Sequence, residues 1–363
     1  GGQLEGTEHP TVRAMSASPG SSNPEYVTAR VRSRRSALFS DDDYRKLVRM
    51  GPAEIARFME ESDYEAEINA LGARHSGVDL IEYALNRNLA KQFDDLLGWA
   101  DGRLYGLIAR YLRKFDAWNV KTVIRGRYSG ADREAVEDDL IRAGEFDGAL
   151  IDSLLGAPSI EEVIERLSGT IFGDDLEAAY EDYEETGVLV PLENAIDRTY
   201  YDHLLDDLVV DEATGQYREF LEAEIDFRNA RNALRLAQSG ADIDPAEYYI
   251  DGGSLFTASE LASLSQNREE LVRAIRDSRY GDDLSGALDE LEAAPSLIRF
   301  ERALDVALLE YTNSLGHVFP LSITPIASYI LAKEREVDNI RAIARGREAG
   351  LSEAQIEEEL VTL

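Results

Sequence analysis

The sequence predicts an all-α protein made of three similar helical domains, and two observations carry this prediction. Along the 363 residues Glu, Ala, Leu and Arg abound and apolar residues recur at i, i+3 and i+4, whereas alternating strand patterns are scarce. One pattern of residues also returns twice, at a spacing of 110 residues. A chain of this length exceeds one ordinary core and divides into domains of about 100 to 150 residues, so three copies fit.

The repeated pattern is acidic-x-x-Asn-apolar-basic-x-x-apolar-Arg. Its polar members are Asp116, Asn119, Lys121 and Arg125 in the first copy, Asp226, Asn229, Arg231 and Arg235 in the second, and Glu336, Asn339, Arg341 and Arg345 in the third. A glycine follows each copy at the same distance, at Gly130, Gly240 and Gly350. Because glycine readily adopts a left-handed conformation, each is predicted to end its helix.

Two further motifs recur in the same order. The first lies upstream of the pattern, at residues 81–86, 192–197 and 300–305, and places a glutamate second, at Glu82, Glu193 and Glu301. The other is an aromatic residue before a predicted helix N-cap, at Phe39-Ser40, Phe146-Asp147 and Phe256-Thr257. The predicted divisions are a disordered tail over residues 1–24 and helical repeats over 25–140, 141–250 and 251–363, each with about five or six helices joined by short loops.

The acidic residue of the pattern falls on an apolar helix stripe, as Asp116 does beside Val120 and Val123. A carboxylate on a buried face requires a partner. We therefore expect the two motif helices of each copy to pack together and their carboxylates to bond within the unit. Arg125, Arg235 and Arg345 are the leading donors, so that Glu193 would pair with Arg235. The alternatives are that these arginines coat a solvated face or bind a partner.

The charge balance is extreme, with 71 acidic residues against five lysines and 33 arginines and a net charge of −33. Such self-repulsion destabilises a compact chain in dilute buffer, but at molar salt the Debye length shrinks to roughly 3 Å. The composition favours a cytoplasm of very high salt, with an ordinary acidic cytosolic protein as the alternative. No basic face for phosphate groups is predicted, so nucleic acid is excluded as a partner.

No catalytic or cofactor-binding constellation is found. The chain has no cysteine, its four histidines are scattered, and no Glu-x-x-His, His-Glu-x-x-His or Gly-Lys sequence occurs, which removes the usual metal and phosphate-loop signatures. We expect no cofactor, no metal and no direct nucleotide binding. No stretch is apolar enough to span a membrane, and residues 1–24 lack the features of a signal peptide. Met15 is a candidate start of the natural chain.

Four segments carry a resemblance to a known family. Residues 320–326 (PLSITPI) and 329–341 (YILAKEREVDNIR) resemble the C-terminal signature of the C subunit of archaeal A-type ATP synthases, which is related to the d subunit of V-type ATPases. Residues 26–32 (YVTARVR) and 116–121 (DAWNVK) are similar to its other hallmarks. The resemblance covers about residues 24 to 363. The C-terminal segment is its most specific part.

The resemblance implies a non-catalytic rotor subunit of the central stalk. Its three helical domains would form a pseudo-threefold funnel or collar on the cytoplasmic face of the membrane. It would join the membrane rotor ring subunits to the central shaft subunits and transmit torque, while other subunits bind ATP. The competing arrangement of the repeats is a linear solenoid, but solenoid units span about 20 to 50 residues. The competing functions are a helical scaffold unrelated to a rotary motor and a helical enzyme.

Overall fold

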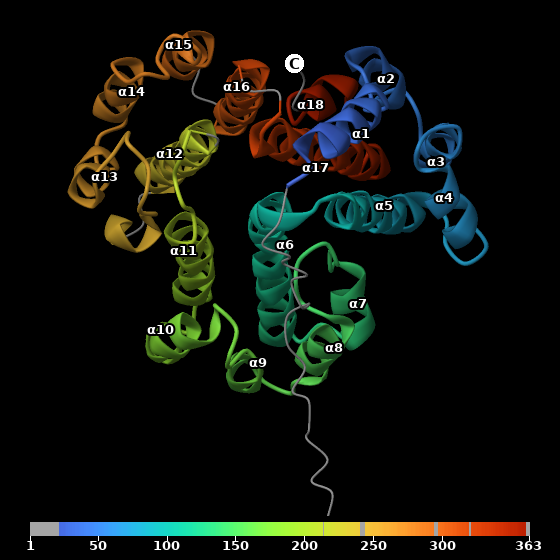
Figure 1. Cartoon of the computed structure of the whole chain (residues 1–363), viewed down its shortest axis with the longest axis horizontal. Coiled ribbons are helices and arrows are strands. Elements are labelled where there is room, and N and C mark those ends of the chain that lie inside the picture. Colours follow the sequence, from blue (N-terminus) through green and yellow to red (C-terminus); the bar gives the residue numbers. More distant parts are fainter. Residues whose placement is uncertain (1–21, 213, 240–243, 294–296, 319–320, 361–363) are drawn as a thin grey trace, which may run out of the picture.

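In the computed structural model, residues 22–212, 214–239, 244–293, 297–318 and 321–360 are described. Every regular element within these ranges is helical, which confirms the predicted all-α class (Figure 1). Most of the predicted tail, residues 1–21, lies outside the described residues, and helix α1 begins at Pro24.

The helices form three groups in Figure 1. The lower group holds α6 (Gly102–Ser129), α7 (Arg133–Asp138), α8 (Gly148–Gly156), α9 (Ile160–Arg166), α10 (Gly173–Thr186) and α11 (Val190–Asp206). The upper left group holds α12 (Gly215–Ser239), the short 3-10 helix η1 (Pro245–Tyr248), α13 (Ala258–Leu264), α14 (Arg268–Arg276), α15 (Ser285–Ala293) and α16 (Leu297–Val318). The upper right group holds α17 (Ile323–Glu348), α18 (Glu353–Glu357), α1 (Pro24–Ser36), α2 (Asp41–Leu47), α3 (Pro52–Glu60), α4 (Glu65–Leu71) and α5 (Gly77–Trp99).

Each group begins in the middle of a sequence repeat. Its first helix (α6, α12 or α17) carries the asparagine pattern of one copy, and its last helix (α11, α16 or α5) carries the glutamate motif of the next copy. The first and last helices of each group pack along each other. The third group therefore joins the two ends of the chain, because α17 packs on α5 and on α1. The domain boundaries drawn at residues 140 and 250 stay a prediction about sequence repeats.

The predicted helix caps are confirmed. Ser40 and Asp43 form a capping box at the start of α2, Asp147 accepts the backbone N–H of Leu150, and Thr257 accepts that of Glu260. At the helix ends, Gly130 and Gly350 have φ of 73° and 75°, the left-handed region that a side chain disfavours. The third predicted glycine, Gly240, lies outside the described residues.

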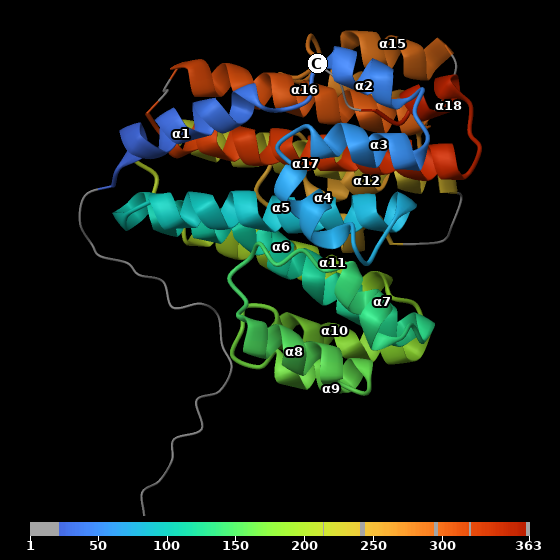
Figure 2. The same cartoon turned by 90° about the vertical axis from the view of Figure 1, so that its right-hand side faces the viewer.

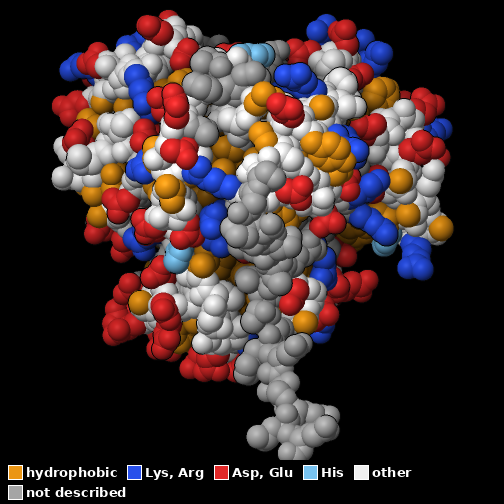
Figure 3. Space-filling view, in the orientation of Figure 1, with side chains coloured by type: hydrophobic (Ala, Val, Ile, Leu, Met, Phe, Trp, Pro, Cys, Tyr) orange, Lys and Arg blue, Asp and Glu red, His pale blue; other side chains and the backbone are white. Residues whose placement is uncertain are grey.

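The long helices run side by side in layers, as Figure 2 shows. Aromatic rings fill the junction of α6 and α12, where the ring of Tyr111 lies 6.5 Å from that of Tyr217 and 5.9 Å from that of Phe220. Acidic side chains are spread over the face seen in Figure 3, in keeping with the net charge of −33. Within the described ranges, no helix has the length and apolar content to cross a membrane.

Candidate functional site where the three repeats meet

The acidic residue of each repeat is buried, with exposed fractions of 1% for Asp116, 0% for Asp226 and 3% for Glu336. Asp116 on α6 accepts the backbone N–H groups of Glu145 at 2.9 Å and Phe146 at 3.1 Å. Burial raises the pKa of Asp116 to about 7, although the two N–H groups act to lower it. At Gly144 a Cβ would overlap the Asp116 carboxylate, so only glycine lets this loop approach.

The second copy repeats this arrangement with more donors. Asp226 on α12 accepts the backbone N–H groups of Ser254 at 2.8 Å and Leu255 at 2.9 Å, and the hydroxyl of Tyr280 at 2.7 Å. The carboxylate thus holds the segment that leads into α13, as Asp116 holds the one that leads into α8. The buried acid of one copy fixes the start of the next.

The third copy returns to the first. Glu336 on α17 accepts the backbone N–H of Phe39 at 2.5 Å and the hydroxyl of Tyr64 at 2.7 Å. Its third donor is Lys333, at 2.7 Å and itself only 3% exposed. Phe39 precedes the N-cap of α2, as Phe146 precedes that of α8. The three acids therefore link the copies in a closed cycle, and the last link joins the two ends of the chain.

The asparagines of the pattern fix the same loops. Asn119 and Ile141 exchange two hydrogen bonds of 2.8 Å, with the side-chain amide donating to the carbonyl of Ile141 and accepting its N–H. Asn229 and Ile250 exchange the equivalent pair, at 2.9 and 3.0 Å. Asn339 makes a side-chain hydrogen bond to Tyr44. In the first two copies the asparagine completes both hydrogen-bonding groups of a buried backbone unit, which would be costly to leave unpaired.

The basic residue of each pattern reaches the last residue of the next glutamate motif. Lys121 pairs with Asp197 and Arg231 with Asp305, while Arg341 donates to the amide oxygen of Asn86 at 2.6 Å. Burial alone would raise the pKa of Asp197, but Arg228 and Lys121 together lower it. The pKa of Asp305 is likewise lowered by nearby arginines against the effect of burial. Both carboxylates are therefore held ionised.

The three pattern-ending arginines pair with the motif glutamates of the neighbouring copy. Arg125 holds Glu193 at 2.8 and 3.1 Å, Arg235 holds Glu301 at 2.5 and 3.1 Å, and Arg345 holds Glu82. The expectation that each pair lies within one copy, with Glu193 on Arg235, is wrong. The pattern in the sequence is unchanged when every partner is shifted by one repeat, so spacing alone does not distinguish the two arrangements.

Sequence reasoning missed a triad two residues before the buried acids. Lys114, Glu224 and Glu334 occupy equivalent positions on α6, α12 and α17, and Lys114 Nζ lies 2.7 Å from Glu334 and 3.6 Å from Glu224. Tyr111 and Tyr201 donate to Glu224 at 3.1 and 3.2 Å. Burial would lower the pKa of Lys114, but Glu334 and Glu224 raise it. The spacing of 110 residues marks these positions, yet a search for identical residue types passes over them.

A cavity of about 380 Å³ lies beside this triad, and we call it the central cavity. Among its lining residues seven are basic and five are acidic. The basic ones are Lys114, Lys121, Arg125, Arg228, Arg231, Arg335 and Arg341, and the acidic ones are Asp197, Glu224, Asp305, Glu334 and Asp338. A second hollow of about 430 Å³ adjoins it, and Trp118 and Arg125 line both.

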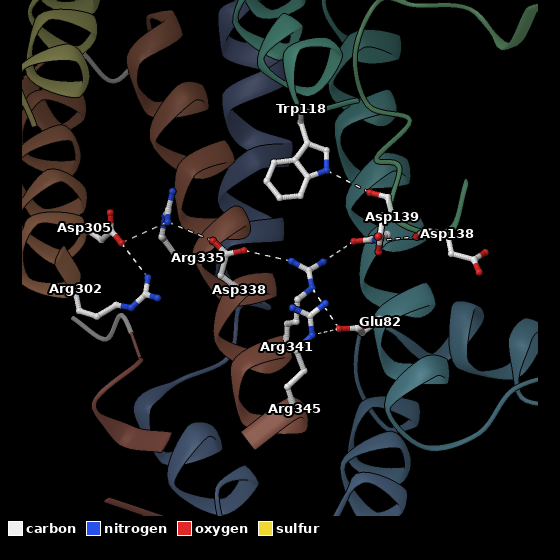
Figure 4. Close-up of polar contacts among 11 residues, drawn as sticks. Glu82, Trp118, Asp138, Asp139, Arg302, Asp305, Arg335, Asp338, Arg341 and Arg345 are labelled. Atoms are coloured by element: carbon white, nitrogen blue, oxygen red, sulfur yellow. Dashed lines mark hydrogen bonds and ion pairs between the residues drawn. The ribbon is translucent and has the colours of Figure 1, made fainter. Parts of the chain in front are cut away.

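A row of charged side chains crosses from α16 over α17 to α5 (Figure 4). Asp305 and Asp338 alternate with arginines, in the order Arg302, Asp305, Arg335, Asp338 and Arg341, at nitrogen–oxygen distances of 3.3 to 3.6 Å. Trp118 of α6 points toward this row and is 42% exposed. Its indole N–H donates to the backbone carbonyl of Asp139 at 3.2 Å. These shared ion pairs tie α16 to α17 within the third copy, and Arg341 extends the row to Glu82 of α5 in the first copy, at 4.0 Å.

The chemistry available here is that of holding helices in place. The carboxylates accept buried N–H groups or pair with arginine and lysine, and the described residues contain no group of three or more side chains suited to hold a metal ion. Fourteen of the fifteen predicted pattern residues contact another copy; the exception is Asn229, whose partner Ile250 is the last residue of its own copy. Their arrangement supports a structural role for the pattern, with the copies closed on one another.

Comparison with known proteins gives the family. The family described as ATP synthase (C/AC39) subunit matches residues 27–359. The C subunit of the A-type ATP synthase of Haloferax volcanii is 77% identical over 344 residues, which cover 95% of this chain and 99% of the relative. That of Halobacterium salinarum is 60% identical over 353 residues, 96% of this chain and 100% of the relative. That of Methanosarcina mazei is 33% identical over 359 residues, 98% and 97% of the two chains. The resemblance carried by residues 26–32, 116–121 and 320–341 is thus confirmed, and the chain belongs to the ATP synthase (C/AC39) subunit family.

Proposed function

We propose that the protein is a non-catalytic rotor subunit of the central stalk of an A-type ATP synthase. It joins the membrane rotor ring to the central shaft and transmits torque between ion translocation and ATP synthesis. The relatives are named as C subunits of A-type ATP synthases, which supports membership in that complex. The proposed place is peripheral, on the cytoplasmic face of the membrane.

The observation that carries the mechanical part is the closed cycle of contacts. Asp116, Asp226 and Glu336 each fix the next copy, and Glu336 closes the cycle by bonding Phe39 and Tyr64 near the start of the chain. A chain closed in this way resists twisting at every junction, whereas a linear array has two free ends. We infer a pseudo-threefold collar, broad enough to sit on a ring and hollow enough to receive a shaft.

Three features support a role without catalysis. The five carboxylates that line the central cavity are each paired with a lysine or an arginine, and the sequence has no phosphate-binding loop. The pairs recur in all three copies, whereas a catalytic group acts at one place.

Relatives in Haloferax volcanii and Halobacterium salinarum, both haloarchaea, support the proposed adaptation of this acidic chain to high salt.

The test is purification of the native complex from membranes through an affinity tag on this chain, at the salt concentration of the cell. The expected result is co-purification of rotor-ring and shaft subunits with this chain in fixed ratio. Recovery of the chain with unrelated helical partners and no ATP synthase subunit would favour the scaffold alternative. Nucleotide hydrolysis by the isolated chain would contradict the non-catalytic assignment.

A further inference from the structure

We propose that the central cavity binds a small inorganic anion, such as chloride, among the three equivalent basic side chains Lys121, Arg231 and Arg341. These residues occupy the same position of the repeated pattern on α6, α12 and α17, and all three line the cavity. The proposal concerns a ligand of this chain alone. It does not depend on the proposed role in the rotor.

The charge balance of the cavity is the reverse of that of the whole chain. Acidic residues outnumber basic ones by 71 to 38 in the sequence, yet the lining has five acidic and seven basic side chains. Positive charge is therefore gathered at the centre of a strongly negative protein. A cavity with low-dielectric walls strengthens the field of such charges, which draws anions inward.

In the lining of the central cavity, single carboxylates are shared between two basic side chains. Asp197 is shared by Lys121 and by Arg228, the latter at 2.7 Å. Asp305 is shared by Arg231 and by Arg335, the latter at 3.6 Å.

The third copy deepens the imbalance. Where the other two copies offer Asp197 and Asp305, the partner of Arg341 is the neutral amide of Asn86. Asp338 lies near both Arg335 and Arg341, and Glu82, outside the lining, lies 4.0 Å from Arg341. Glu224 and Glu334, also in the lining, pair with Lys114. Over the whole lining seven cations face five carboxylates, an excess of two positive charges among the lining residues.

One donor at this place lacks an acceptor. The Nε–H of Arg231 is buried and has no hydrogen-bond partner among the described residues, although the terminal nitrogen of the same guanidinium bonds Asp305. A buried donor without an acceptor is unfavourable, and hydrogen bonds from a guanidinium to an anion are among the stronger ones. An anion in the cavity would accept this N–H and balance part of the excess charge.

The cationic lining suits a compact inorganic anion. Trp118, Tyr200 and Tyr201 also line the cavity, which has a volume of about 380 Å³. Lysine and arginine bind halide and phosphate alike, so the shared chemistry is that of a compact inorganic anion. At molar chloride even a weak site would be filled, and its occupancy would stabilise the junction of the three long helices by mass action.

The experiment measures unfolding of the full chain by urea at constant potassium concentration and ionic strength, with chloride replaced stepwise by gluconate. The matched variants are Arg231→Met and Arg235→Met. Both remove one positive charge from α12, but Arg235 is not among the residues that line the cavity. We expect the urea midpoint to rise with chloride in the native chain and in Arg235→Met, and the rise to fall at least twofold in Arg231→Met. Equal chloride dependence in all three proteins would overturn the proposal, because a general salt effect acts on each alike.

A crystallographic measurement covers the case in which Arg231→Met does not fold. Crystals of the native chain grown in bromide should give an anomalous peak in the central cavity near Arg231 and Lys121. Bromide at the outer surface alone would overturn the site.

A parallel urea titration with phosphate at equal ionic strength distinguishes the two kinds of anion. A larger shift of the urea midpoint with phosphate than with chloride assigns an oxyanion to the site, and the reverse assigns a halide.

Discussion

At the scale of single residues, the buried acids do most to define the structure. Asp116, Asp226 and Glu336 differ in their donors, but each accepts backbone N–H groups of the segment that opens the next copy. A carboxylate can accept several such bonds at once, which satisfies a tight loop that has no helix or strand to pair with. The cost of burying the charge appears in the raised pKa of Asp116.

That pKa gives a prediction about pH. The folded-state pKa of Asp116, about 7, exceeds its ordinary value of 3.8, so the folded state holds this proton more tightly. The resulting contribution to stability is full below pH 4 and is lost as pH rises through 7, by on the order of 4 kcal/mol. The measurement is the free energy of unfolding of the native chain minus that of Asp116→Asn between pH 4 and 8, at constant salt.

The difference is expected to fall steadily over that interval and to level off above pH 8. Subtraction removes the titration of the neighbouring Glu145, whose pKa burial also raises. A difference that stays constant with pH would mean that Asp116 is ionised throughout.

At the scale of elements, close packing of helices depends on small residues at chosen points. On α6, a Cβ at Gly126 would overlap Val136 of α7, and the equivalent Gly346 of α17 lies similarly close to Ile356 of α18. The same glycine and the same apolar partner thus recur in copies one and three. On α5, by contrast, nothing lies within 4 Å of a Cβ at Gly98.

Alanine in place of glycine is predicted to have opposite effects on stability at Gly126 and at Gly98. Gly126→Ala should destabilise the protein by about 1–3 kcal/mol, because α7 must move away from α6. Gly98→Ala is the control and should be neutral or stabilising by up to about 1 kcal/mol, because alanine favours the helix. Urea unfolding of both variants checks this. Equal effects at the two positions would show that α7 does not pack as described.

The ion pairs between helices predict a charge-reversal experiment. Arg125→Glu and Glu193→Arg should each destabilise the protein by about 0.2–1 kcal/mol, and the double variant should recover part of the loss, because the pair joins α6 and α11 near the surface. The effect is measured at the lowest salt at which the chain stays folded, since salt screens exposed pairs. The control is Glu193→Arg with Arg235→Glu. If stability were recovered in this control rather than in the first double variant, Glu193 would pair with Arg235 of its own copy.

At the scale of the whole molecule, the chain closes on itself. Helix α17, from the C-terminal part of the chain, completes the group that contains α1 to α5. Its Glu336 accepts the backbone N–H of Phe39, and its Ser328 accepts a hydrogen bond of 3.1 Å from Arg35 of α1. Two ends that pack as one unit cannot fold independently of each other. The group of α6 to α11 is made from one continuous segment, residues 102–206.

This closure predicts how the molecule responds to truncation. Removal of residues 323–363 should leave α2 to α5 without their buried partners and unprotected against amide hydrogen exchange, while α8 to α11 keep most of their protection. Adding the peptide 323–363 should restore protection in α2 to α5. Full protection of those helices in the truncated chain would contradict the dependence of one end on the other.

The net charge of −33 predicts the response to salt. Helix content followed by circular dichroism should fall as salt is reduced from molar concentration, because self-repulsion is no longer screened. Sodium sulfate and potassium chloride compared at equal ionic strength separate surface exclusion from screening. Full helicity at very low salt would remove the proposed adaptation to a high-salt cytoplasm and leave an ordinary acidic protein.

The helical class, the caps at Ser40, Asp147 and Thr257, and the need of Asp116 for a partner could be predicted from the sequence alone. These follow from local periodicity and from the cost of a buried charge, both of which are written in neighbouring residues. The packing of the helices is needed to see that Glu193 pairs with Arg125 rather than with Arg235. It is also needed to see that Lys114, Glu224 and Glu334 converge. The physical reason is the symmetry of a repeat: moving every partner by one copy leaves the sequence pattern unchanged, so the choice rests on how the helices pack in three dimensions.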